Sequence, residues 1–166
     1  MTVTFLEMTA RPAALPPPQP KGKVAILRSE KPPGHFYRYL YDTIGDAYFW
    51  VDRKKLSPAA LTEVIQDPKN ALYVLYAEGS PAGFAELDFR KEGAANIAYF
   101  GLMPEVIGRG LGFFLLYQTC VNAWAMPIQR LTVNTCTLDH PRALPLYQRL
   151  GFTAYAREER YVELLP

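Results

Sequence analysis

The chain has 166 residues, of which 49% are hydrophobic and 20% are charged, a composition typical of one folded globular domain. The 18 Lys and Arg residues and 16 Asp and Glu residues give a formal net charge of +2, which carries no strong signal for nucleic acid or an anionic membrane. No run approaches the roughly 20 apolar residues of a membrane-spanning helix, and no secretory signal is recognisable. Two cysteines, Cys120 and Cys136, are too few for a disulfide framework or a zinc site. We therefore expect a cytoplasmic protein without a metal ion, a nucleic-acid partner or a membrane anchor.

The first 20 residues are the one compositionally biased segment. Five of them are prolines, at positions 12, 16, 17, 18 and 20. Proline fixes φ and has no backbone N–H, so such a segment favours an extended conformation. We expect residues 1–20 to form an extended or disordered arm and residues 21–166 to form a single domain. A partner-binding role for the arm is the alternative.

The first half of the domain is predicted to hold a strand, two helices and three further strands. Ser57-Pro58 suits the start of the second helix, because Ser caps a helix and Pro fits its first turn. The turns that separate the three later strands are short, so these strands should be antiparallel neighbours. In chain order, the six elements are expected over residues 23–28, 36–50, 57–65, 71–77, 83–89 and 96–103.

The second half alternates between helices and strands. Phe113, Leu116, Cys120 and Trp124 recur at helical spacing, and Pro127 follows the end of that helix. The pattern is a mixed α/β one, in which an antiparallel meander precedes strand–helix–strand units. In chain order, the elements are expected over residues 113–124, 130–137, 141–150, 152–156 and 161–164.

A glycine-rich loop lies between the third strand of the meander and the long helix. It reads Pro104-Glu105-Val106-Ile107-Gly108-Arg109-Gly110-Leu111-Gly112. A helix N-terminus offers unpaired N–H groups, glycine lets the backbone approach an anion, and Arg109 adds a cation, so the loop suits a pyrophosphate. It is neither a P-loop, which ends in Gly-Lys-Ser/Thr, nor a dinucleotide fingerprint, which follows a first strand. A purely structural turn is the alternative.

A second segment, residues 143–152, reads Ala-Leu-Pro-Leu-Tyr-Gln-Arg-Leu-Gly-Phe and is predicted as an amphipathic helix that ends at glycine. Together the two segments resemble the GNAT N-acetyltransferase superfamily. In that family a Gln/Arg-x-x-Gly-x-Gly/Ala loop binds the pyrophosphate of acetyl-CoA, and an A-x-x-L-Y-x-x-x-G-F segment supplies a tyrosine near the thioester sulfur. The matching positions here are Gly110, Gly112, Ala143, Leu146, Tyr147, Gly151 and Phe152.

The resemblance implies a mixed, mostly antiparallel central sheet with helices on both faces, and acetyl-CoA as co-substrate. Two positions depart from the family pattern: Ile107 stands at the usual Gln/Arg position, and His140 stands where an asparagine often precedes the second helix. His140 is therefore expected either to contact the coenzyme or to satisfy backbone groups at the helix start. The coenzyme contacts implied by the resemblance are Leu102, Met103, Gly108, Arg109, Gly110, Leu111, Gly112 and His140.

The implied reaction is direct attack of a primary amine on the thioester. Tyr147 is expected to protonate the departing thiolate, and backbone N–H groups of a bulged strand within residues 99–103 are expected to stabilise the oxyanion. We expect Glu86 to act as the general base, with a salt-bridged strand carboxylate as the alternative; Asn96 occupies the position where the family often has an acid. The aromatic segment near residues 35–50 should build the acceptor site. Its expected residues are His35, Tyr37, Trp50 and Tyr99.

The sequence does not identify the acceptor. It is either a small-molecule amine or the amine of a peptide, and the chain is either a monomer or a homodimer. The alternative hypothesis is an acyl-CoA-binding or regulatory module with the same fold and no catalytic activity. Ile107 and Asn96, which differ from the family pattern, leave this alternative possible.

Overall fold

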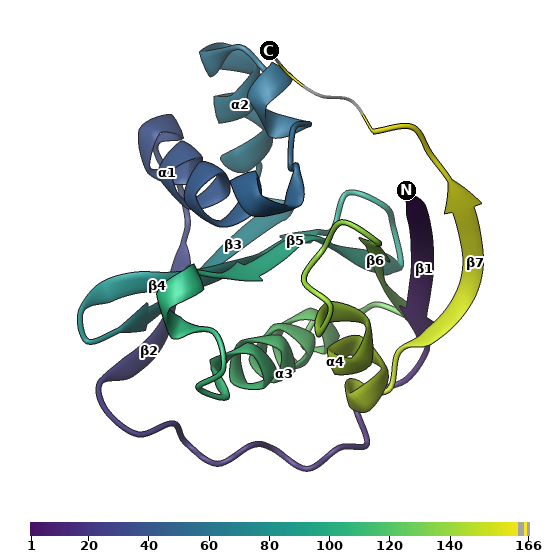
Figure 1. Cartoon of the computed structure of the whole chain (residues 1–166). Coiled ribbons are helices and arrows are strands. Elements are labelled where there is room, and N and C mark those ends of the chain that lie inside the picture. Colours follow the sequence, from purple (N-terminus) through teal and green to yellow (C-terminus); the bar gives the residue numbers. More distant parts are fainter. Residues whose placement is uncertain (163–164, 166) are drawn as a thin grey trace.

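A seven-stranded sheet forms the middle layer of the computed structural model, which describes residues 1–162 and Leu165 (Figure 1). The strand order is β2-β3-β4-β5-β6-β1-β7. Neighbouring strands are antiparallel except β5 and β6, which are parallel. The strands are β1 (Thr2–Met8), β2 (Val24–Ser29), β3 (Asn70–Ala77), β4 (Ser80–Asp88), β5 (Ala94–Leu102), β6 (Arg130–Cys136) and β7 (Thr153–Glu159).

Helices cover both faces of the sheet. Figure 1 shows α1 and α2 on one side and α3 and α4 on the other. The helices are α1 (Gly34–Gly45), α2 (Pro58–Ile65), α3 (Leu111–Trp124) and α4 (Ala143–Leu150), and three short 3₁₀ turns are η1 (Asp46–Tyr48), η2 (Arg53–Lys55) and η3 (Pro104–Val106). The expected mixed, mostly antiparallel sheet with helices on both faces is confirmed.

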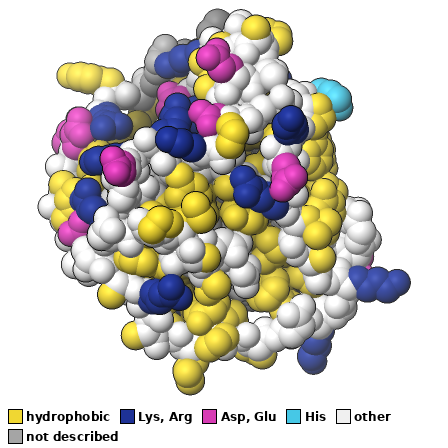
Figure 2. Space-filling view, turned by 180° about the vertical axis from the view of Figure 1, so that it is seen from behind, with side chains coloured by type: hydrophobic (Ala, Val, Ile, Leu, Met, Phe, Trp, Pro, Cys, Tyr) yellow, Lys and Arg dark blue, Asp and Glu magenta, His cyan; other side chains and the backbone are white. Residues whose placement is uncertain are grey.

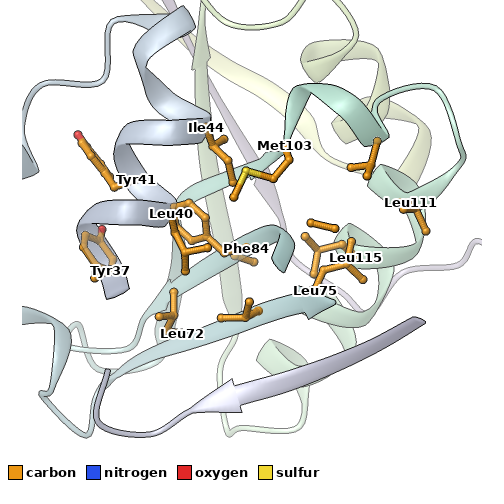
Figure 3. Close-up of a cluster of buried hydrophobic side chains, with 14 of the residues drawn as sticks. Tyr37, Leu40, Tyr41, Ile44, Leu72, Leu75, Phe84, Met103, Leu111 and Leu115 are labelled. Atoms are coloured by element: carbon orange, nitrogen blue, oxygen red, sulfur yellow. The ribbon is translucent and has the colours of Figure 1, made fainter. Parts of the chain in front are cut away.

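One hydrophobic core lies between α1, α2 and the first half of the sheet, and it extends to Leu111 and Leu115 of α3 (Figure 3). Tyr37, Leu40, Tyr41 and Ile44 recur at spacings of three and four residues, so they share one face of α1, and each is at most 1% exposed. Burial of a side chain such as Leu40 contributes about 1.5–3 kcal/mol. A second core lies between α3, α4 and the strands β1 and β6.

The N-terminal residues do not form the arm that we expected. Thr2–Met8 is a strand, β1, that pairs antiparallel with β6 on one side and with β7 on the other. Its Val3, Leu6 and Met8 side chains are buried, and this burial explains why the strand docks. Only the segment after Met8 lies outside helices and strands, and Arg11 in it donates a hydrogen bond to the carbonyl of Trp124, 3.2 Å away.

The sheet forks between β5 and β6. These strands are in register only from Ala94 to Ile97, because Ala98 is an extra residue on β5: Glu86 of β4 lies opposite Tyr99, and the next residue, Leu87, lies opposite Ile97. Such a bulge bends its strand and breaks the ladder. Beyond the bulge, β5 continues beside β4, whereas β6 continues beside β1.

A few expected boundaries differ from the structure. The first helix ends at Gly45 rather than continuing to residue 50, because a 3₁₀ turn follows. The last strand is β7, and of the strand expected over residues 161–164, Tyr161 and Val162 lie outside any strand and residues 163–164 lie outside the described residues. On the face seen from behind, acidic and basic side chains are interspersed, in keeping with the small net charge (Figure 2). No helix in the described part of the chain is long and apolar enough to cross a membrane.

Candidate active site

A cavity of about 650 Å³ lies at the fork between β5 and β6. One wall is β5 from Ile97 to Leu102, and the other includes Val133, Asn134 and Cys136 of β6. The first turn of α3, the first turns of α4 and the segment that follows α1 complete the lining. The fork therefore opens the sheet just where two helices begin.

The glycine-rich loop closes one end of this cavity. Gly108 and Gly110 line it, and both adopt a left-handed conformation, with φ of 90° and 78°. Only glycine adopts such φ values without strain, and a Cβ added at either position would meet nothing within 4 Å. The backbone of the loop is therefore open to a ligand. Arg109 is exposed and Leu111 is buried, and neither lines the cavity.

The first turn of α3 faces the same end. Gly110 caps the helix without a side-chain hydrogen bond, so the first N–H groups of α3 have no partner within the helix. Gly112 lines the cavity, and a Cβ added there would lie 3.6 Å from Leu102 Cδ1 and 3.7 Å from Leu146 Cδ2, which is ordinary contact. A larger group at Gly112 would thus narrow the space between β5 and α4.

The backbone of β5 presents donors to the fork. The N–H of Met103 donates to the carbonyl of Ala82, 2.8 Å away, so Met103 points its amide at β4. Antiparallel pairing alternates, so the N–H groups of Leu102 and Phe100 point away from β4, toward the side that β6 has left. Leu102 lines the cavity as expected, whereas Met103 is 1% exposed and lies in the core.

Tyr147 reaches the cavity from α4. Its ring packs edge-on against Phe100 and Phe152, with centroids 6.1 and 5.9 Å apart, and the residue is 5% exposed. Within the described residues, its hydroxyl makes no hydrogen bond. Burial raises the pKa of Tyr147 above its ordinary value, and Asp139 raises that pKa further. The hydroxyl is therefore protonated at neutral pH and free to donate.

The loop between β6 and α4 holds Tyr147 in this position. Asp139 Oδ2 accepts hydrogen bonds from Thr135 Oγ1 at 2.6 Å and from the Cys136 N–H at 2.9 Å. His140 Nδ1 accepts a hydrogen bond from the Arg142 N–H at 3.1 Å, so in neutral His140 the proton lies on Nε2. His140 thus satisfies a backbone group at the start of α4, and it also lines the cavity.

Glu86 lies away from the cavity, in a buried cluster. It is fully buried, and its Oε2 is 2.6 Å from Nη2 of Arg53, whose side chain is 17% exposed. Tyr37 donates its hydroxyl proton to Glu86 Oε1 at 2.5 Å, and Asn70 donates to Oε2 at 3.3 Å. Burial lowers the pKa of Arg53, but Glu86 opposes this effect and the net pKa is raised. Both carboxylate oxygens are therefore engaged, and the guanidinium stays charged.

The expected acceptor residues separate into two groups. Trp50 and Tyr99 line the cavity together with Tyr41 and Tyr48, whose neighbouring rings touch. Tyr37 does not line the cavity, because it holds Glu86, and His35 is exposed on α1 elsewhere. One side of the cavity is consequently an aromatic wall.

The structure brings in residues that the sequence analysis did not single out. Arg142, at the N-cap of α4, and Arg149 of α4 line the cavity, and the Arg149 guanidinium lies 4.0 Å from the centre of the Phe113 ring. Their spacing was a usable signal, since residues 142, 146 and 149 share one face of a helix. Arg160, Tyr161 and Val162 also line the cavity, and no local sequence pattern indicated that they would.

No metal site accompanies the cavity in the part of the chain that the structure describes. No group of three or more His, Cys, Asp or Glu residues there is arranged to hold a metal ion. The chemistry available is that of backbone donors, aromatic rings that include the buried Tyr41 and Tyr147, and a set of arginines.

Comparisons with known proteins agree with this geometry. Residues 36–152 match the acetyltransferase (GNAT) family model. A GCN5-related N-acetyltransferase from Kribbella flavida is 19% identical with a TM-score of 0.64, and the match covers 95% of this chain and 56% of that one. A second such protein, from Sphaerobacter thermophilus, is 20% identical with a TM-score of 0.61, at 94% and 49% coverage. This chain thus spans about half the length of these two proteins.

A shorter relative is matched over most of its length. The ribosomal-protein-S18-alanine N-acetyltransferase from Escherichia coli is 17% identical with a TM-score of 0.62, and the match covers 81% of this chain and 80% of that one. At these identities the structural matches show the fold alone. No curated protein sequence matches the chain. Since the family model spans most of the sequence and the fold agrees, the chain belongs to the acetyltransferase (GNAT) family.

Proposed function

We propose that the protein transfers the acetyl group of acetyl-CoA to a primary amine by direct attack. The observation that carries this proposal is the cavity at the fork, which has the glycine loop at one end, the aromatic wall at the other, and Tyr147 in its lining. Family membership supports acetyl-CoA as the acyl donor.

The glycine loop and α3 are the proposed pyrophosphate site. Backbone N–H groups at a helix N-terminus carry partial positive charge and suit an anion. Ile107 offers no polar side chain at the position where the family has Gln or Arg, so binding depends on the backbone donors of Gly108 to Gly112. Arg142 and Arg149, which line the cavity, add charge for phosphate groups.

The chemistry needs a site for the oxyanion and a proton for the leaving group. The amine nitrogen forms a bond to the thioester carbon, a tetrahedral oxyanion develops, and the C–S bond then breaks. The N–H groups of Phe100 and Leu102 are the proposed oxyanion donors. Tyr147 is the proposed general acid, because its raised pKa keeps the proton that the coenzyme thiolate requires.

Glu86 has a structural role in this proposal, in place of the general base that we expected from the sequence. Its oxygens accept from Tyr37, Arg53 and Asn70, and it does not line the cavity. A carboxylate so engaged is poorly placed to take a proton from an amine. The acceptor is therefore proposed to attack as the neutral amine, and the proton that its nitrogen loses after the C–N bond forms passes to water.

The experiment that tests the proposal combines coenzyme binding with turnover. Acetyl-CoA is titrated by calorimetry, and thiol release is followed with a panel of primary amines. Saturable binding with amine-dependent thiol release supports the proposal. Binding without release across the panel supports the non-catalytic module that the departures at Ile107 and Asn96 kept open.

A pair of glycine variants tests the position of the coenzyme. Gly112→Ala adds a methyl group inside the cavity with only ordinary contacts, and alanine favours a helix, so the fold should tolerate it. Loss of one charge-assisted contact is worth about 1.5–3 kcal/mol, so coenzyme affinity should fall about tenfold or more. Gly34→Ala is the matched control, since its Cβ would lie 4.0 Å from its neighbours and far from the cavity lining. If the two variants bind acetyl-CoA with equal affinity, the coenzyme does not bind beside Gly112.

A further inference from the structure

The acceptor end of the cavity is walled by aromatic rings that pack in a continuous row. Ring centroids are 4.9 Å apart for Tyr41 and Tyr99, 5.1 Å for Trp50 and Tyr99, and 6.3 Å for Tyr48 and Trp50. The row ends at His140, whose ring lies 6.5 Å from that of Tyr48. All five rings line the cavity.

The aromatic wall (Tyr41, Tyr48, Trp50 and Tyr99), which His140 extends, is held in a fixed position. Trp50 packs against two glycines: a Cβ at Gly45 would lie 2.5 Å from Trp50 Cε3, and a Cβ at Gly101 would lie 3.3 Å from Trp50 Cη2. Any larger residue at either glycine would displace the indole. The wall is thus a pre-organised surface rather than a set of mobile side chains.

Polar contacts also hold two tyrosines of the wall, Tyr41 and Tyr99. The Tyr41 hydroxyl lies 3.3 Å from the Tyr99 hydroxyl and accepts a hydrogen bond from the Arg53 N–H at 3.2 Å. The Arg53 guanidinium lies 5.3 Å from the centre of the Tyr99 ring, and the same group forms the ion pair with Glu86. The Glu86 cluster consequently supports the wall from behind.

The carboxylates around this end are already partnered. Asp139 Oδ2 accepts two hydrogen bonds from the β6 end, and Glu86 is paired with Arg53. Asp52 lines the rim with 80% of its side chain exposed and lies 4.0 Å from Lys55 Nζ. A polycationic acceptor needs several unpaired carboxylates, and this end offers ring faces instead.

The chain after β7 contributes to the rim of the cavity. Arg160, Tyr161 and Val162 line it, and the N-terminal amine of Met1 donates to the Arg160 carbonyl at 2.8 Å. Asp52, in the segment after α1, lines the same cavity. A cavity of about 650 Å³ suits a small molecule better than an extended peptide.

From the wall, its rigidity and the rim, we infer that the acceptor is a small primary amine that carries one aromatic ring. The ring stacks or packs edge-on against the wall, while the amine extends toward the thioester. Aromatic pairs favour offset-stacked or edge-to-face geometry, and such a pair is more stable than its buried area alone accounts for. This inference rests on the proposed function and narrows its substrate class.

The test compares 2-phenylethylamine with n-hexylamine, spermidine and an alanine-initiated tripeptide, at saturating acetyl-CoA and with thiol release as the readout. We expect kcat/KM for 2-phenylethylamine to exceed that of each other amine about tenfold or more, the size expected of ring packing in a pre-formed site. Tyr48→Leu should shrink the preference over n-hexylamine at least about threefold, with coenzyme affinity unchanged. Tyr39→Leu, at an exposed ring on α1 outside the cavity, is the matched control and should keep the preference.

The outcomes separate this inference from the proposed function. Turnover of the amines without an aromatic preference, or with spermidine or the tripeptide as the best acceptor, would overturn the inference and leave amine acetylation standing. An unchanged preference in Tyr48→Leu would overturn the role of the wall. Coenzyme binding with no turnover of any amine would overturn both.

Discussion

The buried pair of Arg53 and Glu86 allows a quantitative test of what Glu86 does. In Arg53→Met the guanidinium is lost and a fully buried carboxylate has no counter-charge, which typically costs about 3–5 kcal/mol. For a domain of 166 residues, each kcal/mol corresponds to roughly 2–4 °C in Tm, so the variant should melt roughly 6–20 °C lower. The pair is well shielded, with side-chain exposures of 17% and 0%, so solvent screening reduces this figure little.

The second half of the cycle removes the charge from Glu86. Glu86→Gln keeps an acceptor for the Tyr37 hydroxyl, so it should cost less, about 1–2 kcal/mol. In the double variant Arg53→Met/Glu86→Gln no buried charge is left unpaired, and its loss should fall short of the sum of the two single losses by about 2 kcal/mol or more. Urea unfolding at a common m value measures all four proteins.

Two results would refute the reasoning. If Arg53→Met loses less than about 1 kcal/mol, or if the losses simply add, the pair is not the buried interaction described above. If Glu86→Gln keeps its stability but loses about a hundredfold in kcat, Glu86 acts on the substrate after all, as the sequence led us to expect. A kcat within about threefold of the unaltered protein, with an unshifted pH–rate profile, supports the structural role.

Three further outcomes are expected. Tyr147→Phe should lower kcat about a hundredfold, as loss of a general acid does, with the KM for acetyl-CoA within about twofold; an unchanged kcat would remove Tyr147 from the mechanism. The pKa of Tyr147 is raised by burial, so above the ordinary tyrosine pKa of about 10 the unfolded chain ionises this residue while the folded protein keeps it neutral, and stability is lost; the urea midpoint of the unaltered protein should therefore fall relative to that of Tyr147→Phe above about pH 10, and a relative rise there would contradict the sign. Cys136 lines the cavity and should react with a maleimide at neutral pH more slowly when acetyl-CoA is present. Cys120 is fully buried, with a pKa raised to about 12, and should react only after unfolding. Intact-mass analysis separates one label from two, and rapid double labelling of the native protein would contradict the assignment.

The parts of the site that follow from local chemistry were predictable. Gly108 and Gly110 needed left-handed φ values before a helix, and Tyr147 had to face inward from a helix whose spacing is plain in the sequence. The resemblance to a family added the roles that we propose for these residues. Periodicity and turn residues were likewise enough for most of the helices and strands.

The parts that depend on distant partners were not predictable. Glu86 on a strand has no local feature that separates a general base from a buried ion pair, and only the approach of Arg53 from η2 decides it. The strand at Thr2–Met8 has β-branched and aromatic residues, yet the prolines that follow dominate the composition of the first 20 residues. Its burial depends on β6 and β7, more than a hundred residues later in the chain.

The position of β1 has a consequence for how the molecule is made. β1 is synthesised well before β6 and β7, the two strands between which it lies, and the Met1 amine and the Arg160 carbonyl meet across 159 residues. Until β6 and β7 emerge, Val3, Leu6 and Met8 have no sheet to enter. Closure of such a long loop is slow, and the waiting segment exposes apolar side chains meanwhile. Completion of this part of the sheet, beside the cavity, therefore has to wait until β6 and β7 have been made.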